Sequence, residues 1–390
     1  MIVTHLSLRD FRNYAEAELE LHGGTNLFIG RNGQGKTNLV ESLVFLSTLS
    51  SHRVSGDQAM VRAGCEAAIV RTTFTHGDRE LLAEVQINRS GTNRAQINRS
   101  AIRPRDLPWY VRTVLFAPED LALVRGEPSG RRRFIDQLSM ILAPRFSAVL
   151  ADYERVLKQR NTLLKSLRGG LSAAQEQTLT IWDEKLISLG TEIIARRAVL
   201  VEQIRDPLRR AYAAVVDDDH EPTIDLSLSI DGYDVDADDT ADRAANSAVP
   251  DSARIEAGFR AAMERRRRAE RERGLTLVGP HRDDLLFGLN RLPVKGYASH
   301  GESWSFVLAL KLATAELLRR DSDLGDPVLI LDDVFAELDR QRRRRLAEAV
   351  TGFEQVLITA AVREDIPEEL RAAPIFIRAG RVVDEDAVDV

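Results

Sequence analysis

The sequence is poor in cysteine and has no long apolar run, and each absence excludes a class of protein. Cys65 is the one cysteine among the 390 residues, so no internal disulfide can form and no cluster of thiolates can hold a structural metal. We expect it in the core or on a strand. The longest apolar stretches, such as Val328–Leu331, are far too short to cross a bilayer, and the N-terminus lacks a basic-then-apolar leader. We therefore expect a globular, cytoplasmic protein.

The charge balance is acidic overall but uneven along the chain. The formal net charge is −6 and the pI is near 5.8, which taken alone would argue against nucleic acid as a partner. Acidic residues, however, crowd into Asp217–Asp242, whereas arginines cluster at Arg131–Arg133, at Arg265–Arg273 and at Arg342–Arg345. An arginine cluster is either a solvated helix face or a surface for phosphates. The acidic tract is not expected to touch DNA; it is a spacer or a surface for a basic partner.

The stretch "FIGRNGQGKTNLVESL", Phe28–Leu43, matches the phosphate-loop pattern G-x-x-x-x-G-K-[ST]. An apolar strand precedes it and a helix-forming run follows, which is the context that the pattern requires. Its glycines let backbone N–H groups face phosphate oxygens, while Lys36 would reach the β- and γ-phosphates and the Thr37 hydroxyl would bind Mg²⁺. A flexible glycine loop is the alternative. The predicted ATP-binding residues are Gly30, Arg31, Asn32, Gly33, Gln34, Gly35, Lys36 and Thr37.

A second stretch, "DPVLILDDVFAELD" near the C-terminus, predicts the acidic half of the same site. The strand Val328–Leu331 delivers Asp332 and Asp333 to its carboxyl end, where α/β sheets place their ligands. Asp332 is placed to hold Mg²⁺, directly or through water, and Asp333 to orient or deprotonate the attacking water. The alternative is a buried strand that ends in an N-cap aspartate.

Between these two stretches, "YASHGESWSFVLALKLATAELLRR" predicts a polar turn that runs into an amphipathic helix. Ser299 and Gly301 precede the helix, so a hydroxyl, free backbone N–H groups and the positive end of the helix dipole would be available to an anion. The turn could serve the phosphate loop of its own subunit or that of a second subunit in a dimer. Sequence spacing does not decide between the two.

Hydrophobic periodicity divides the chain into three segments. Residues 1–130 alternate apolar and polar side chains around the phosphate loop, as strands do. Residues 131–273 mostly show helical spacing, with a turn at Gly169–Gly170 and a short strand at Ile224–Ile230, and residues 274–390 return to α/β character. We predict an α/β ATPase head built from both ends of the chain, with a mostly helical lobe inserted between them.

In their order, these motifs resemble the ABC-type ATPase heads of the SMC kind and, within that group, the RecF family of bacterial recombination mediators. The resemblance is carried by "LRDFRNY" (Leu8–Tyr14), "GRNGQGKTNLVESL" (Gly30–Leu43), "LFAPEDLALVRGEPSGRRRFID" (Leu115–Asp136), "GPHRDD" (Gly279–Asp284), "YASHGESWSFVLALKLA" (Tyr297–Ala313) and "LILDDVFAELD" (Leu329–Asp339). These stretches cover most of the head, whereas the inserted lobe matches in length and character more than in motif.

The resemblance implies an ATP-dependent homodimer that binds DNA. Two ATP molecules with Mg²⁺ would lie between two heads, with Gly30–Thr37 of one subunit facing Ser299, Gly301 and Glu302 of the other. Asp333 would act as the base, and weak ATP hydrolysis would serve as a switch. Members of the family recognise duplex DNA at single-strand gaps, help RecA to load together with RecO and RecR, and act in DNA replication, repair and the SOS response.

The arginine clusters predict where DNA would bind, through phosphate contacts that do not depend on sequence. The predicted contacts are Arg131, Arg132, Arg133, Arg265, Arg266, Arg267 and Arg268. Two other functions stay open. One is a structural DNA clamp of the SMC type, which the short helices around Gly169–Gly170 disfavour, and the other is a nucleotide-binding scaffold without useful hydrolysis.

Other positions have competing interpretations. The strand "QVLITAAV" ends in Thr359 and Ala360, with no histidine where transporter ATPases have a γ-phosphate sensor, which counts against a transport ATPase. Glu119 and Asp120 stand where a Q-loop glutamine would be expected. His281 is either a hydrogen-bonded core histidine or a residue near the nucleotide.

Overall fold

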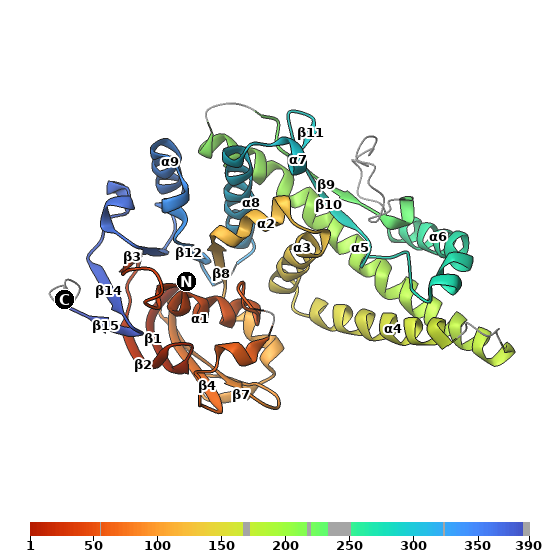
Figure 1. Ribbon diagram of the computed structural model, residues 1–390, viewed down its shortest axis with the longest axis horizontal. Coiled ribbons are helices and arrows are strands. Elements are labelled where there is room, and N and C mark those ends of the chain that lie inside the picture. Colours follow the sequence, from red (N-terminus) through yellow and green to blue (C-terminus); the bar gives the residue numbers. More distant parts are fainter. Residues whose placement is uncertain (55, 167–171, 217–219, 233–250, 323, 385–390) are drawn as a thin grey trace. The chain divides into compact units, whose positions relative to one another are not determined.

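The described chain folds into two compact units (Figure 1). The computed structural model describes residues 1–54, 56–166, 172–216, 220–232, 251–322 and 324–384. The first unit, the head, consists of Met1–Leu121, Pro207–Asp219 and Ser299–Val390, and the second, the lobe, consists of Ala122–Asp206 and His220–Ala298. The lobe is therefore an insertion in the sequence of the head. It includes residues 274–298, which the sequence analysis groups with the C-terminal part of the head.

A six-stranded sheet forms the centre of the head and explains where its loops meet. Its order is β15 (Arg381–Val383), β14 (Pro374–Arg378), β3 (Gly24–Ile29), β13 (Gln355–Ala360), β12 (Val328–Asp332) and β8 (Thr113–Phe116). All strands but β15 run parallel. Every residue of β12 and β13 is buried, as is typical of parallel strands that are covered on both faces. Parallel strands bring the segments after β3 and β12 to one edge of the sheet.

The second sheet of the head is antiparallel. Its order is β2 (Tyr14–Glu20), β1 (Ile2–Phe11), β4 (Ala67–His76), β5 (Arg79–Asn88), β6 (Arg94–Ile97) and β7 (Ser100–Ile102). Buried side chains alternate with exposed or half-buried ones along most of β2 and β4, as the sequence predicts. The two sheets are joined by Gln355, whose Oε1 accepts from Val3 N at 2.7 Å and whose Nε2 donates to Val3 O at 2.8 Å.

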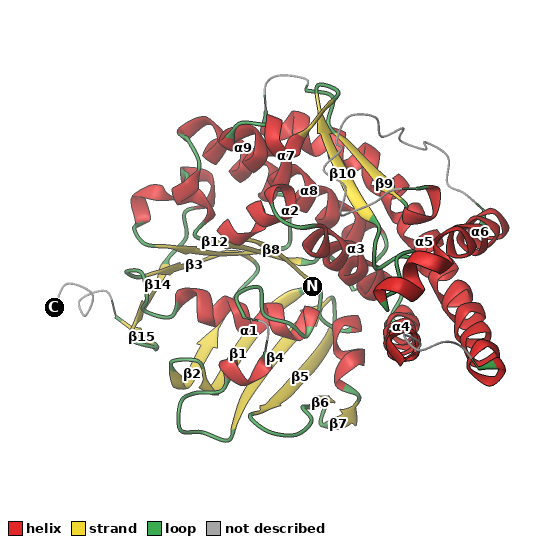
Figure 2. Ribbon diagram, turned by 45° about the vertical axis from the view of Figure 1, so that its right-hand side comes forward, coloured by secondary structure: helices red, strands yellow, loops and turns green. Residues whose placement is uncertain are grey.

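Helices complete the head. Helix α1 (Lys36–Thr48) lies between the two sheets (Figure 2), where Leu39 and Phe45 are fully buried in a core shared with Leu6 and Val85. Helices α8 (His300–Arg320) and α9 (Arg340–Val350) also belong to the head. The short 3₁₀ turns of the head are η1 (Asp57–Met60), η2 (Pro104–Trp109), η3 (Pro118–Asp120), η6 (Val334–Glu337), η7 (Arg363–Asp365) and η8 (Glu368–Leu370).

The lobe is mostly helical, as the periodicity of the sequence predicts. Its helices are α2 (Leu121–Arg125), α3 (Pro128–Leu142), α4 (Phe146–Ser166), α5 (Ala173–Val215), α6 (Ser252–Arg273) and α7 (Val294–Tyr297). A small antiparallel sheet has the order β11 (Leu292–Pro293), β10 (Asp284–Leu289) and β9 (Thr223–Ser227). Leu164 of α4 and Leu179 of α5 pack together. The predicted turn at Gly169–Gly170 and half of the acidic tract, residues 217–219 and 233–242, lie outside the described residues. Within the described residues, no helix is both long and apolar enough to span a membrane.

Candidate nucleotide-binding site

The phosphate loop follows β3 and leads into α1. Gly33 and Gly35 have φ angles of 81° and 121°, a region that side chains rarely allow. Gly30 is needed for a different reason, because a Cβ there would lie 2.3 Å from the carbonyl oxygen of Ile377 on the neighbouring strand β14. Tyr14 is fully buried and donates its hydroxyl to Gly35 O at 3.1 Å, so it is a core side chain that supports the loop.

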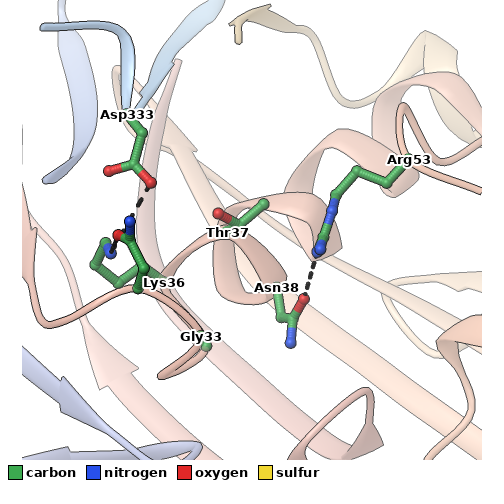
Figure 3. A pocket seen from close by; sticks show the side chains of 8 residues that line it. Gly33, Lys36, Thr37, Asn38, Arg53 and Asp333 are labelled. Atoms are coloured by element: carbon green, nitrogen blue, oxygen red, sulfur yellow. Dashed lines mark hydrogen bonds and ion pairs between the residues drawn. The ribbon is translucent and has the colours of Figure 1, made fainter. Parts of the chain in front are cut away.

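Lys36 is a buried cation with incomplete bonding. Its side chain is 2% exposed, yet its Nζ lies 3.5 Å from both Arg31 O and Asn32 Oδ1 and 3.9 Å from Asp333 Oδ2 (Figure 3). These contacts are long for charge-assisted hydrogen bonds. A buried ammonium is costly unless it is paired, so the geometry favours an anionic ligand at this position.

Asp332 and Thr37 form a set of oxygen ligands beside Lys36. Asp332 Oδ1 accepts a hydrogen bond from Thr37 Oγ1 at 3.1 Å and another from Thr359 Oγ1 at 2.6 Å. Burial raises the pKa of Asp332 to about 6, although the hydrogen bond from Thr359 opposes the shift. A hydroxyl and a carboxylate are ligands that Mg²⁺ accepts, and Mg²⁺ usually takes only one or two carboxylates beside phosphates and water. The residues therefore fit Mg²⁺.

Asp333 completes the cluster through a strained backbone. Its φ of 51° lies in the left-handed region, and its N–H donates to Thr359 Oγ1 at 3.0 Å and more weakly to Thr359 O at 3.3 Å. Strain of this kind persists only where the surrounding structure imposes it, and it gathers at functional sites. Burial raises the pKa of Asp333, while the ammonium of Lys36 opposes the shift. The raised pKa makes this carboxylate a better proton acceptor.

A cavity of about 200 Å³ opens between these groups (Figure 3). It is lined by Asn32, Gly33, Gly35, Lys36, Thr37, Asn38, Arg53 and Asp333. Asn38 and Arg53 are not among the residues predicted from the sequence to bind ATP. Arg53 donates to Asn38 Oδ1 at 2.8 Å, which holds its guanidinium beside the phosphate loop. Arg53 follows α1 in a segment without hydrophobic periodicity or a motif, so no sequence pattern identifies it as a residue of the site.

The predicted anion-binding turn forms the start of α8. Ser299 is the N-cap, and its hydroxyl accepts from Glu302 N at 3.2 Å while Ser299 N donates to Glu302 Oε2 at 2.8 Å. This capping box gives Glu302 a role within its own turn. Gly301 lies against Arg342, whose Nη2 is 2.9 Å from the place of a Cβ. Arg342 also pairs with Asp339, the N-cap of α9, so the turn and Asp339 share one guanidinium.

Two of the three residues with open interpretations, His281 and Asp120, lie in structural positions. His281 is in the lobe, where its Nδ1 accepts from the Tyr153 hydroxyl at 2.7 Å and its Nε2 donates to Thr276 O at 3.2 Å. Burial lowers the pKa of His281 to about 3. This geometry confirms the interpretation as a core histidine. Asp120 accepts from Ala117 N at 2.9 Å and pairs with Lys311 at 2.8 Å. Glu119 is exposed nearby, and its charge contributes to the raised pKa values of Asp332 and Asp333.

The predicted DNA contacts of the first arginine cluster need one correction. Arg131 is 4% exposed and forms a two-pronged ion pair with Asp284, at 2.7 and 2.8 Å. It is a structural residue of the lobe and cannot reach a phosphate. Arg132 is partly buried and donates to Asp283 O at 2.7 Å, whereas Arg133 is exposed. The run of arginines could not reveal this, because Asp284 is 153 residues away in the sequence.

The second cluster lies on α6, and two of its four predicted contacts, Arg267 and Arg268, meet acidic neighbours. Arg267 pairs with Glu176 and Glu264 at 3.2 Å each, and Arg268 pairs with Glu272 at 2.9 Å. Arg265 is exposed and donates to Ile230 O at 3.2 Å, and Arg266 is also exposed. A phosphate would have to compete with these carboxylates at Arg267 and Arg268.

Sequence comparison places the whole chain among named relatives. The family described as RecF/RecN/SMC N terminal domain matches residues 2–378. The chain is 62% identical to the DNA replication and repair protein RecF of Clavibacter michiganensis subsp. michiganensis, over 99% of this chain and 97% of that protein. It is also 62% identical to the protein of the same name from Leifsonia xyli subsp. xyli, over 98% of this chain and 100% of that protein.

Solved structures agree with this placement. The chain superposes on a structure described as the recombination mediator protein RecF-ATPrS in the RecFOR pathway with a TM-score of 0.85 and 27% identity, over 98% of this chain and 97% of that chain. An Smc head domain from Pyrococcus furiosus gives a TM-score of 0.52 at 15% identity, over 98% and 95% of the two chains, and shows the fold alone. The α/β architecture predicted from the sequence, an ABC-type ATPase head of the SMC kind, is thereby confirmed. The chain belongs to the RecF family.

Proposed function

We propose that this chain binds ATP and Mg²⁺ in the cavity at its phosphate loop and uses the bound nucleotide to dimerise on DNA. The observation that carries the proposal is the incompletely bonded, buried ammonium of Lys36 beside the oxygens of Thr37, Asp332 and Asp333. A triphosphate would complete these bonds, since lysine and the N–H groups of such a loop bind phosphate oxygens. The related structure described as RecF-ATPrS supports the same assignment.

We propose one task for each of five groups at the site. Lys36 and the amides of Gly33 and Gly35 hold phosphate oxygens, while Thr37 and Asp332 hold Mg²⁺, which when bound neutralises the phosphate charge. Asp333, with its raised pKa, orients the attacking water and accepts its proton. Asp333 is partly shielded from solvent and stands opposite Lys36, which keeps its carboxylate facing the phosphate loop. The expected result is slow ATP hydrolysis that works as a switch.

The dimer is proposed to complete the site through the turn at the start of α8. The amides of Glu302 and Ser303 bond to Ser299, but helix geometry leaves those of His300 and Gly301 without acceptors in their own helix. These amides, the Ser299 hydroxyl and the helix dipole suit the γ-phosphate held by a second subunit. We assign Glu302 to the cap, because its carboxylate bonds to Ser299 N and would repel a phosphate.

DNA binding is proposed to follow ATP binding. Relatives described as a DNA replication and repair protein and as a mediator in the RecFOR pathway support a role at single-strand gaps in duplex DNA. RecO and RecR would act there with the chain to load RecA. The exposed arginines of the predicted clusters are Arg133, Arg265, Arg266 and Arg268, and we propose that these contact phosphates.

The helix lengths favour a switch over a structural clamp. Helix α4 has 21 residues and α5 has 43, which correspond to about 30 Å and 65 Å at 1.5 Å per residue. Part of α5 belongs to the head, so the portion in the lobe is shorter still. A long tether that could enclose DNA at a distance is not present among the described residues.

Sedimentation of the purified chain tests the proposal. The unsubstituted chain is expected to form dimers with ATP, Mg²⁺ and gapped duplex DNA, and Lys36→Ala is expected to remain a monomer under the same conditions. Asp333→Asn should bind ATP and stay trapped as a DNA-bound dimer, because it cannot complete hydrolysis. A chain that remains monomeric with every ligand would refute the dimer. Full DNA release by Asp333→Asn would favour a scaffold that does not need hydrolysis.

A further inference from the structure

The turn between β14 and β15 contacts the phosphate loop directly. Strand β14 pairs with β3 as far as Phe376 opposite Ile29, the last residue of β3. The chain then reverses at Ala379 and Gly380, which have φ angles of 48° and 72°, and Arg378 pairs with Arg381 across the turn. Two consecutive residues with positive φ are typical of a tight hairpin turn. Because the strand ladder pairs only the flanking residues, the two central amides are available to other acceptors.

Both central amides bond to one residue of the phosphate loop. Ala379 N donates to Gln34 Oε1 at 2.8 Å, and Gly380 N donates to the main-chain oxygen of Gln34, also at 2.8 Å. The side chain of Gln34 is therefore directed to the hairpin, and Gln34 does not line the nucleotide cavity. A residue that the phosphate-loop pattern leaves unspecified thus joins the loop to the end of the sheet.

A second turn bonds to the same main-chain oxygen. Asn13, between β1 and β2, donates its Nδ2 to Gln34 O at 3.1 Å, and its Oδ1 accepts from Asn38 Nδ2 at 2.8 Å. Gly380 packs against this turn so closely that a Cβ would lie 2.5 Å from Asn13 O. Two turns from different sheets therefore hold Gln34, and Asn13 extends the bonding to Asn38 in the cavity lining.

We infer that Gln34 is a positioning residue through which the β14–β15 hairpin fixes the phosphate loop before a nucleotide arrives. The inference rests on the proposed function, because it requires phosphates to bind at this loop. Glycines give the loop its shape but also make it flexible, so a free loop would lose more conformational entropy on binding. A loop that is already fixed binds more tightly, because less ordering accompanies association. The gain in affinity should arise from the contacts of the loop with the phosphates, and not from contacts with the base or the sugar.

Calorimetry with two ligands tests this inference. Gln34→Met keeps the length of the side chain but removes the acceptor for Ala379 N, and Gly380→Ala pushes the turn away from Asn13. Each variant is expected to bind ATP and inorganic tripolyphosphate, both with Mg²⁺, about tenfold more weakly than the unsubstituted chain. The melting temperature without ligand should change little in Gln34→Met. Gln58→Met, at an exposed glutamine of η1 outside the cavity lining, is the matched control and should bind both ligands normally.

The outcomes separate the inference from the function on which it rests. The double variant should bind both ligands with about the affinity of whichever single variant binds less tightly, because both substitutions break the same contact. If the losses of affinity in the two single variants instead add up in the double variant, the inference is overturned. Unchanged affinities in both single variants would overturn the inference, as would a loss for ATP without a loss for tripolyphosphate, since that result would place Gln34 at the nucleoside. If the unsubstituted chain binds neither ligand, the proposed function fails, and the inference fails with it.

Discussion

The head and the lobe both bury charged side chains, but they bond them differently. In the lobe, Arg160 is 2% exposed and its guanidinium donates to Asp183, Glu270 and Thr276 at 2.6 to 2.8 Å. In the head, Lys36 is buried to the same extent, yet its nearest polar contacts are 3.5 to 3.9 Å away. The two cations differ in the completeness of their bonds and not in their burial.

This difference separates a structural charge from a site for a ligand. A buried ion that is fully bonded by its own chain has no reason to leave those partners, and its removal leaves the partners unsatisfied. A buried ion with long contacts is costly for the empty protein and gains from a ligand of opposite charge. Both residues are buried cations, so positive charge and burial alone would not show that Arg160 is structural and that Lys36 is available to a ligand.

The largest effect on stability is expected from breaking the ion pairs and hydrogen bonds of Arg160 in the lobe. Arg160→Met leaves the buried Glu270 without its partner and should lower the free energy of unfolding by about 3–5 kcal/mol. Urea denaturation measures the loss. Arg155→Met on the same helix is the control, since Arg155 is 71% exposed and should change stability by less than about 1 kcal/mol. If both variants lost the same free energy of unfolding, the bonds of Arg160 would not be specially stabilising, and the contrast between the buried cations of the lobe and the head would not hold.

A smaller, pH-dependent effect is expected at Asp283. Its Oδ1 accepts from Ser229 N at 2.8 Å and from Ser229 Oγ at 2.9 Å, while its Oδ2 has no hydrogen-bond partner among the described residues. Burial raises the pKa of Asp283 to about 6, against the opposing charge of Arg197. Because the folded pKa exceeds the unfolded value of about 3.9, the protonated form contributes stability below pH 4, and this contribution is lost as the pH rises through 6.

Urea denaturation of Asp283→Asn and the unsubstituted chain would measure this contribution. Between pH 5 and pH 8, the unsubstituted chain should lose about 1–2 kcal/mol of stability relative to the variant, which cannot titrate at this position. Parallel pH profiles would show that the folded-state pKa of Asp283 lies outside this range. If the pKa lies below the range, the lobe tolerates an incompletely bonded charge just as the head does, and the comparison between the units would weaken.

Lys36 should show the opposite sign of effect from Arg160. Lys36→Met removes an ammonium whose burial is poorly compensated, so the free energy of unfolding without nucleotide should stay the same or rise by about 1 kcal/mol. Excess ATP and Mg²⁺ should stabilise the unsubstituted chain and leave the variant unaffected, since a ligand stabilises only the state that binds it. Thermal unfolding with and without ATP provides the measurement. Marked destabilisation of Lys36→Met would assign Lys36 to the fold.

The smallest effect is expected at a surface arginine. Arg133→Ala should weaken binding to gapped duplex a few-fold and lower the salt slope by about 1, as the loss of one phosphate contact would. Arg268→Ala is the comparison, because Arg268 is 92% exposed but pairs with Glu272. Fluorescence anisotropy at two salt concentrations distinguishes the variants. If the salt dependence of DNA binding were unchanged in Arg133→Ala, the first cluster would be a solvated helix face and not a DNA contact.

Local motifs allowed much of the head to be predicted from the sequence. The chain positions of Lys36 and Thr37 follow from the strand, the loop and the helix around them, and Asp332 ends a strand that is apolar throughout. Such contexts fix the geometry over a few residues, and the parallel sheet then brings the two segments together. The family resemblance pointed to the same fold, and the superposition on related structures confirms it.

The rest depended on partners that are distant in the sequence. Nothing near Arg131 reveals Asp284, and nothing near Gln34 reveals Ala379, which is 345 residues away. Hydrophobic periodicity reports which face of an element is buried, but it does not report which polar group is bonded across the core. Arg53 is a different case, because its partner Asn38 lies only 15 residues away, but no motif includes it.

The way the chain returns to the head in mid-sequence limits how it can be shortened. Pro207–Asp219 belongs to the head although it lies between two segments of the lobe. Leu208 and Tyr212 are buried, and Arg210 pairs with Glu316 of α8 at 2.5 Å. A single deletion that joins residue 121 to residue 299 would remove this part of α5 together with the lobe. A minimal ATPase head must therefore be assembled from three pieces of the gene and not from two.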